Sequence, residues 1–170
     1  MITPELLDEL YRHMEWADSV VWNHVPEHDG VPDDELRELL VHIHSTQEAF
    51  LAVWGGEPFT IRRGKEFDTL SAVRDYARPF YAAAAEVREQ LTPDALNEPM
   101  PVPWVKYFER VIGRKAEVTT RGETMMQVAM HTQYHRAQVN ARLRILGVEP
   151  PLVDYIAWVW RGRPGPSDDS

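Results

Sequence analysis

The fold of this chain is decided by residues 120–147, which read TRGETMMQVAMHTQYHRAQVNARLRILG. Thr120 and Glu123 have the spacing of a capping box, in which each side chain binds a free amide at the start of a helix. Gly147 is typical of the residue just beyond a helix C-terminus. Between these ends one stripe recurs at helical period, at Val128, His131, His135, Val139, Leu143 and Leu146. This pattern predicts one long helix that turns both histidines toward the core.

Three other segments have the pattern of long helices. Residues 3–25 begin with a Thr cap, a proline and an acid, and residues 33–54 begin with acids and end at a Gly pair. A third helix is expected over residues 68–91, with a kink or break at Pro79. Four long helices predict an all-α fold, an up-down four-helix bundle of the kind that often holds metal in its core.

The remaining segments are shorter. Residues 97–119 contain three spaced prolines and predict an irregular connection before the last long helix. Residues 152–160 predict a short extra C-terminal helix, which must pack against its own bundle or a second copy because it is too short to be stable alone. We expect a single domain over residues 1–160 and a disordered tail over residues 161–170.

The composition excludes several classes of function. The net charge of −9 disfavours nucleic-acid binding, which needs a basic surface. The chain has no Cys, so it can form neither a disulfide nor a thiolate metal site, and any thiol chemistry must use a small-molecule thiol. No signal peptide and no membrane-spanning apolar run is recognisable, and a cytoplasmic location without membrane contact is therefore expected.

His131 and His135 are the strongest candidates for a functional site. Residues four apart on a helix stack on one face, so one rigid helix offers a metal two imidazole ligands at fixed separation. A catalytic metal needs a third protein ligand, and the second helix offers His42 or His44, between which periodicity does not choose. His13 and His24 on the first helix are further candidates. For any one histidine alone, a surface position or an ordinary hydrogen bond is the commoner explanation.

Other polar groups have weaker functional patterns. Glu48 and Glu123 are candidate acid–base groups, although helix-surface and capping roles are commoner for such residues. Arg62, Arg63 and Lys65 can meet an anionic ligand, but a solvated loop explains them equally simply.

The chain resembles the DinB-like (DinB/YfiT) superfamily of four-helix-bundle metalloproteins. The match lies in His131-Thr-Gln-Tyr-His135-Arg136-Ala137-Gln138, where the family usually has H-x3-H-R-G-Q, so Ala137 replaces a Gly. It continues in residues 143–151, LRILGVEPP, and in Asp154. The second helix matches the pattern L-L-x-H-I at Leu39-Leu40-Val41-His42-Ile43, and Trp16-Ala17-Asp18 resembles W-A-N of the first helix.

The resemblance implies a metal, often zinc or nickel, held by His42, His131 and His135. It also implies frequent homodimers, and branches that use small thiols, such as bacillithiol transferases and mycothiol-dependent isomerases. We therefore expect a metal-dependent thiol S-transferase or isomerase that acts on a small-molecule substrate with a low-molecular-weight thiol. A metal-dependent hydrolase is the first alternative, because the same metal activates water. A non-enzymatic metal-binding bundle that serves stress response or partner binding is the second.

Overall fold

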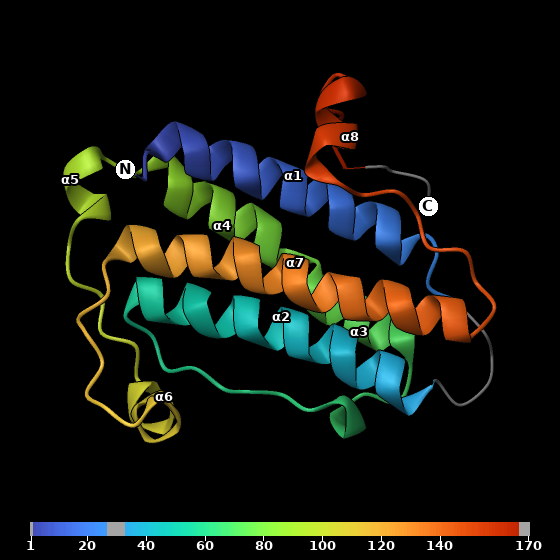
Figure 1. Cartoon of the computed structure of the whole chain (residues 1–170), viewed down its shortest axis with the longest axis horizontal. Helices are drawn as coiled ribbons and strands as arrows, with labels where there is room; N and C mark the ends of the chain where they lie inside the picture. The colour runs from blue at the N-terminus through green and yellow to red at the C-terminus, as the bar shows by residue number, and fades with distance from the viewer. Residues whose placement is uncertain (1, 27–32, 167–170) are drawn as a thin grey trace.

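The computed structural model describes residues 2–26 and 33–166, which form a helical bundle (Figure 1). Its long members are α1 (Pro4–Trp22), α2 (Asp34–Gly55) and α7 (Arg121–Ile145). A fourth arm consists of α3 (Leu70–Ala77) and α4 (Pro79–Glu89), which meet at the predicted break before Pro79. The predicted all-α fold is confirmed, and within the described residues the only β-type pairing is a single bridge between Pro99 and Thr120.

The bundle departs from simple up-down alternation in one connection. After α2 the chain runs back along the whole of that helix, through the 3-10 turn η1 (Gly64–Glu66), before α3 begins (Figure 1). The arm α3–α4 is consequently parallel to α2, and the order is up-down-down-up. Residues 56–69 can make this crossing because fourteen extended residues reach about 45 Å, whereas the 22 residues of α2 are about 33 Å long. The sequence pattern identified this segment as a loop but gave no sign of its course.

The helix ends follow the capping signals. Thr3, Asp33 and Thr120 each accept an amide of the first helical turn, and Thr120 and Glu123 form the predicted capping box. Gly147 has φ 81°, a left-handed conformation that suits Gly just after α7. These caps fix where α2 and α7 start, and therefore the register in which they meet.

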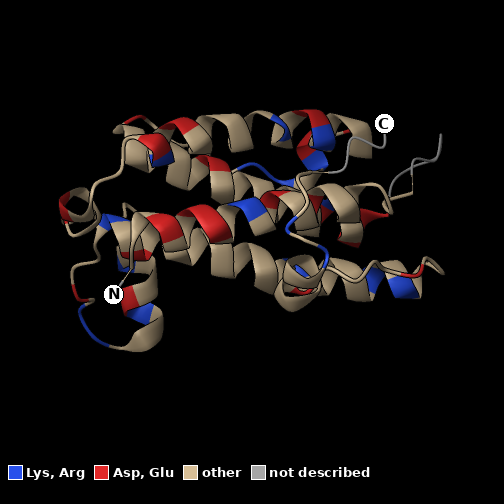
Figure 2. Cartoon of the chain, turned by 90° about the horizontal axis from the view of Figure 1, so that it is seen from above, with Lys and Arg blue, Asp and Glu red and all other residues tan. Residues whose placement is uncertain are grey.

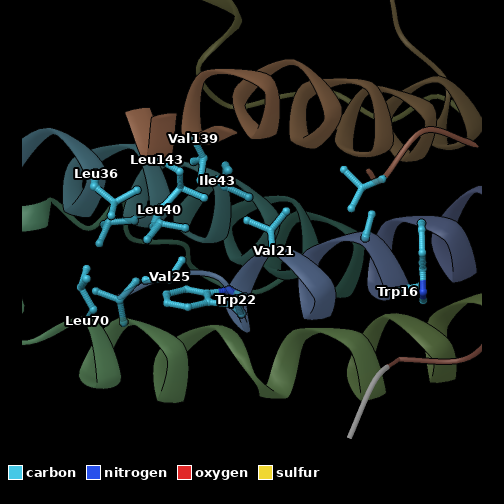
Figure 3. Close-up of a cluster of buried hydrophobic side chains, with 14 of the residues drawn as sticks. Trp16, Val21, Trp22, Val25, Leu36, Leu40, Ile43, Leu70, Val139 and Leu143 are labelled. Atoms are coloured by element: carbon cyan, nitrogen blue, oxygen red, sulfur yellow. The ribbon is translucent and has the colours of Figure 1, made fainter. Parts of the chain in front are cut away.

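Two hydrophobic clusters fill the bundle. One cluster, shown in Figure 3, joins α1, α2, α3 and α7 around Trp22, Leu40 and Val139. The other joins the opposite halves of α1, α2 and α7 with α4, around Tyr11, Phe50 and Phe80. The polar groups described below lie between these clusters or along their edge.

The buried stripe of α7 differs from the predicted one. It consists of Met125, Val128, Thr132, Arg136, Val139 and Leu143. His131 and His135 are only half-buried, and Leu146 is 39% exposed. Val128, Val139 and Leu143 are buried as predicted, but each core position predicted for a histidine is taken by the next residue. Arg136 can occupy such a position because it finds a buried carboxylate partner.

The segments outside the bundle vary in how they pack. Two short helices precede α7: α5 (Pro93–Leu96), and α6 (Val105–Ile112), which lies within the segment predicted to be irregular. No residue of α6 is buried, and its apolar side chains Tyr107, Phe108, Val111 and Ile112 are each more than half exposed. The spaced prolines end at residue 103 and α6 begins at Val105, so the irregular part of this connection is shorter than residues 97–119.

The C-terminal helix α8 (Tyr155–Trp160) packs against its own bundle. Trp158 is fully buried and its ring lies 5.5 Å from that of His13 on α1. The predicted disorder of the tail does not extend to residues 161–166, because Trp158 donates to the carbonyl of Pro164 and Arg163 pairs with Glu9. Residues 167–170 lie outside the described residues.

Acidic residues, red in Figure 2, are spread over several helices in that view, as expected for a net charge of −9. In the described part of the chain no helix is both long and apolar enough to cross a membrane.

Candidate metal centre

Three histidine rings meet where α2 and α7 lie side by side. His131 and His135 project from successive turns of α7 toward α2, and His42 projects from α2 toward them. The three are half-buried, and one nitrogen atom from each lies within 4.8 Å of the other two. His44 is not part of this group. The structure therefore brings together the histidine that the family pattern indicated and the pair that the helical spacing indicated.

The spacing of these rings fits a shared metal ion. The Nε2 atoms of His42 and His135 are 3.2 Å apart. Two imidazoles that bind one ion at about 2.0 Å with tetrahedral angles have nitrogens about 3.3 Å apart. The rings of His131 and His135 have centroids 4.4 Å apart, and those of His42 and His131 are 5.0 Å apart. Three imidazole nitrogens suit zinc, nickel, copper and iron alike, and the group is only partly buried.

Burial keeps two of these histidines neutral. It lowers the pKa of His131 to about 4, with the charges of His135 and His42 as smaller causes. Burial also lowers the pKa of His42, followed by the charges of His135 and Arg63. Only a neutral imidazole has the free lone pair that a metal binds. Both side chains are therefore in the metal-binding form at neutral pH.

A fourth side chain orients the third ring. Gln138 Oε1 lies 2.7 Å from Nδ1 of His135, so this nitrogen donates its hydrogen and Nε2 keeps its lone pair toward His42. Metal-binding histidines usually have such a partner on the second nitrogen. In the sequence Gln138 is recognisable only as part of the family motif, because its bond to His135 depends on the side-chain geometry of the helix.

The remaining histidine candidates are engaged elsewhere. His44 is buried, accepts the indole hydrogen of Trp22 on Nε2 and bonds Gln47 Oε1 through Nδ1. The Nε2 of His13 bonds the carbonyl of Val153, and Nδ1 of His24 bonds the carbonyl of Val20 on the surface. His13, His24 and His44 therefore have ordinary hydrogen-bonded roles, the commoner explanation for a histidine on its own.

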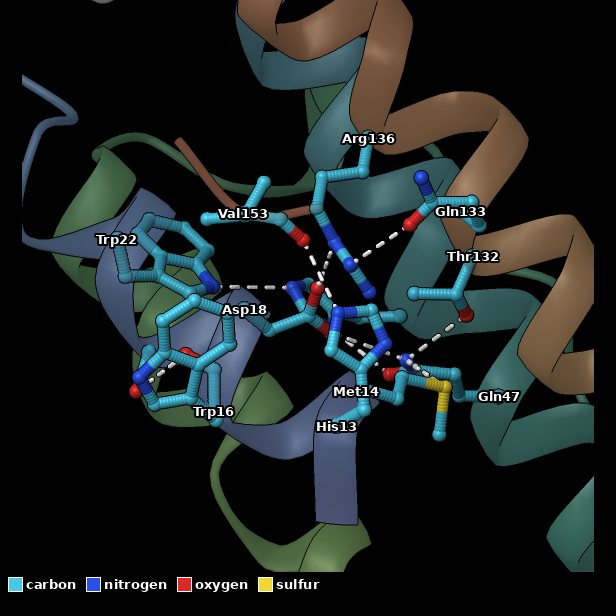
Figure 4. A network of polar contacts seen from close by, with 12 residues as sticks. His13, Met14, Trp16, Asp18, Trp22, Gln47, Thr132, Gln133, Arg136 and Val153 are labelled. Carbon is cyan, nitrogen blue, oxygen red and sulfur yellow. Dashed lines mark hydrogen bonds and ion pairs between the residues drawn. The ribbon is translucent and has the colours of Figure 1, made fainter. Parts of the chain in front are cut away.

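A second polar cluster lies in the core and includes Arg136, the residue after His135 (Figure 4). Arg136 Nε donates to Asp18 Oδ1 at 2.8 Å, and both side chains are more than 90% buried. Asp18 Oδ2 also accepts from Tyr81 and from Gln47, and Gln47 donates to Thr132. This network of charged and polar groups joins α1, α2, α4 and α7. In the sequence Arg136 stands in the motif of the last long helix and Asp18 in the motif of the first helix. Neither motif indicates that the two residues pair with each other.

The other candidates have clear outcomes. Glu123 is the capping residue, and Arg62 is held by Glu66 at 2.7 Å with its guanidinium 5.0 Å from the Phe67 ring centre. Glu48 is half-buried, which raises its pKa, and its Oε1 has no hydrogen-bond partner among the described residues. Arg63 and Lys65 are exposed.

Taken together, the fold and the site define a helical bundle with a three-histidine group that can hold a metal ion. The model of the DinB family matches residues 1–162, and the chain belongs to that family. No curated protein matches the chain.

Proposed function

We propose that His42, His131 and His135 bind one divalent metal ion, zinc or nickel, and that the protein is a metal-dependent thiol S-transferase or isomerase. The observation that carries the proposal is the 3.2 Å separation of the Nε2 atoms of His42 and His135. A nitrogen atom of His131 lies within 4.8 Å of a nitrogen of each. A metal ion stabilises such a group of half-buried imidazoles, whose nitrogens otherwise face one another without a complete set of partners. Family membership supports the same assignment.

A bound divalent ion lowers the pKa of a coordinated thiol and so supplies a thiolate near neutral pH. The residues of the chain do the rest of the work. Gln138 fixes the tautomer of His135, and burial holds His131 neutral. The chain offers no Cys as a fourth ligand, which leaves that position to a small thiol.

The activity test uses metal-loaded protein, a panel of small thiols (cysteine, N-acetylcysteine, coenzyme A) and the electrophile monobromobimane. We expect faster conjugation with at least one thiol than in buffer, and loss of the gain after chelation and in His131→Ala. Hydrolysis of p-nitrophenyl acetate without any thiol, with no conjugation, would replace this proposal by the hydrolase. Neither activity, with metal still bound, would favour a non-enzymatic metal-binding bundle.

We also propose a homodimer formed through the outer face of α7. Between Glu123 and Arg142 the sequence has a single charged residue, Arg136, and it is buried. Met130 and Tyr134 on the same helix are 63% and 64% exposed. Two copies crossing antiparallel about Tyr134 would bring Glu123 of one copy near Arg144 of the other, so the face is complementary to itself in charge and apolar at its centre.

Sedimentation at micromolar concentration tests the pairing. We expect a dimer mass for the wild type and a monomer for Tyr134→Glu. Tyr107→Glu is the matched control, since Tyr107 is 59% exposed on α6 and should leave the dimer intact. A wild-type monomer would reject the dimer and leave the metal proposal unaffected, because all three ligands come from one chain.

A further inference from the structure

The chain that crosses back along α2 passes close to His42. The amide of Arg62 donates to Ser45 Oγ at 2.7 Å, and the amide of Gly64 donates to Glu38 Oε2 at 2.5 Å. Ser45 lies three residues after His42 and Glu38 four residues before it, so both are within about one helical turn of the histidine. These two bonds fix the backbone of Arg63, the residue between them, beside the turn of α2 that carries His42.

The direction of the Arg63 side chain follows from the backbone. Arg63 has φ −124° and ψ 152°, an extended conformation in which successive side chains point to opposite sides. The guanidinium of Arg62 is turned toward Glu66, Phe67 and Tyr76. The side chain of Arg63 therefore leaves the segment on the side opposite to that of Arg62, and its backbone lies beside the turn of α2 that carries His42.

Arg63 is free to receive a ligand. It is exposed, and in residues 2–26 and 33–166 its guanidinium has no hydrogen bond or ion pair, in contrast to Arg62. The nearest acid on α2 is Glu38, whose Oε2 is taken by the amide of Gly64. Three neutral histidines do not neutralise the charge of a bound divalent ion. The positive charge of Arg63 beside them would add to the charge of that ion. Such a place attracts anions in a protein that otherwise carries a net negative charge.

We propose that Arg63 is an anion-binding residue of this centre, and that the substrate or thiol that binds there carries a carboxylate. This inference rests on the proposed metal function and adds the chemical class of the ligand. The planar guanidinium can grip both oxygens of a carboxylate while another atom of the same molecule reaches the histidine group. An uncharged thiol of similar size lacks that second contact.

The test compares two small thiols on cobalt-loaded protein. 3-Mercaptopropionate carries a carboxylate and 2-mercaptoethanol does not, and binding of either thiolate to cobalt(II) is followed by its charge-transfer absorption. We expect the carboxylate thiol to bind at least about 10-fold more tightly to the wild type, the gain of one charge-assisted hydrogen bond. Arg63→Gln should remove this preference and leave 2-mercaptoethanol binding unchanged, and Arg63→Lys should retain part of it.

Lys65→Gln is the matched control, because it removes one exposed positive charge two residues away on the same segment. If Lys65→Gln and Arg63→Gln reduce the preference equally, the effect is one of overall charge and the role of Arg63 is overturned. A wild type without preference overturns it as well while leaving the metal centre intact. Failure of the protein to bind cobalt(II) through its histidines would overturn the proposed function and this inference together.

Discussion

Two polar clusters lie next to each other on α7, one centred on His135 and the other on Arg136, and they differ in what completes them. Arg136 and Asp18 are buried in contact; Tyr81 and Gln47 donate to Asp18, and Gln133 accepts from Arg136. The three histidines are only half-buried, and their nitrogens face one another. The protein satisfies the first cluster by itself, whereas His131 of the second makes no hydrogen bond among the described residues. The first cluster is therefore structural, and the second is the one to which we assign the proposed metal.

The largest effect should come from breaking the buried cluster. Asp18→Ala leaves the buried guanidinium of Arg136 without its carboxylate, and we expect the free energy of unfolding to fall by about 3–5 kcal/mol. Urea denaturation of the metal-free protein measures it. The double variant Asp18→Leu/Arg136→Met should recover most of the loss, because no charge is then left buried. A loss below about 1 kcal/mol in the single variant would show that the pair is not what holds the helices together here.

Removing one histidine should do the opposite, with a large effect on metal binding and a small one on folding. We expect His131→Ala to weaken zinc binding by more than ~100-fold, which is the upper range for mutating a residue that only hydrogen-bonds to a metal ligand. The unfolding free energy without metal should stay within about 1 kcal/mol of the wild type, because the ring is half-buried. Competition titration with a chromogenic chelator measures the affinity, and His24→Ala, on the surface, serves as the control. Equal zinc affinity in the two variants would remove His131 from the site.

A smaller effect is expected for the residue that orients His135. Gln138→Ala removes the acceptor for Nδ1–H, and the ring can then turn or change tautomer. We expect zinc affinity to fall by about 10–100-fold. Gln138→Glu keeps an acceptor at the same position and should retain tighter binding than the Ala variant. The same competition titration compares both, and an unchanged affinity in Gln138→Ala would make this hydrogen bond incidental.

The smallest effect expected is on the pH dependence of stability, through His44. His44 is buried beside the core network, and burial lowers its pKa from the ordinary 6.5. Its unfolded state therefore binds a proton that the folded state rejects, and stability present above about pH 6.5 is lost as the pH falls. The contribution is at most about 1.4 kcal/mol per pH unit. In His44→Gln, urea midpoints measured with chelator between pH 7.5 and 5.5 should decline less steeply than in the wild type, and equal slopes would exclude His44 as a cause.

The sequence predicted the helices and the three histidines that meet in space better than it predicted their surroundings. Caps and periodicity are local, so the four long helical segments and the i, i+4 pair could be recognised directly. The choice of His42 over His44 needed a family pattern, because both flank the apolar face of α2. The buried Arg136 was missed because a charged residue fits a core position only with its partner, and Asp18 is 118 positions away in sequence. Arg63 beside His42 depends on the course of a crossing segment that has no periodic pattern.

The most direct test of the account is the coordination of zinc in the wild-type protein. Metal-free protein should bind one zinc ion per chain, and X-ray absorption should show three imidazole nitrogens at about 2.0–2.1 Å. His131→Ala should lose the imidazole signature together with the tight site. Absence of tight binding, or zinc bound mainly by carboxylates with His42, His131 and His135 unaffected, would contradict the central claim.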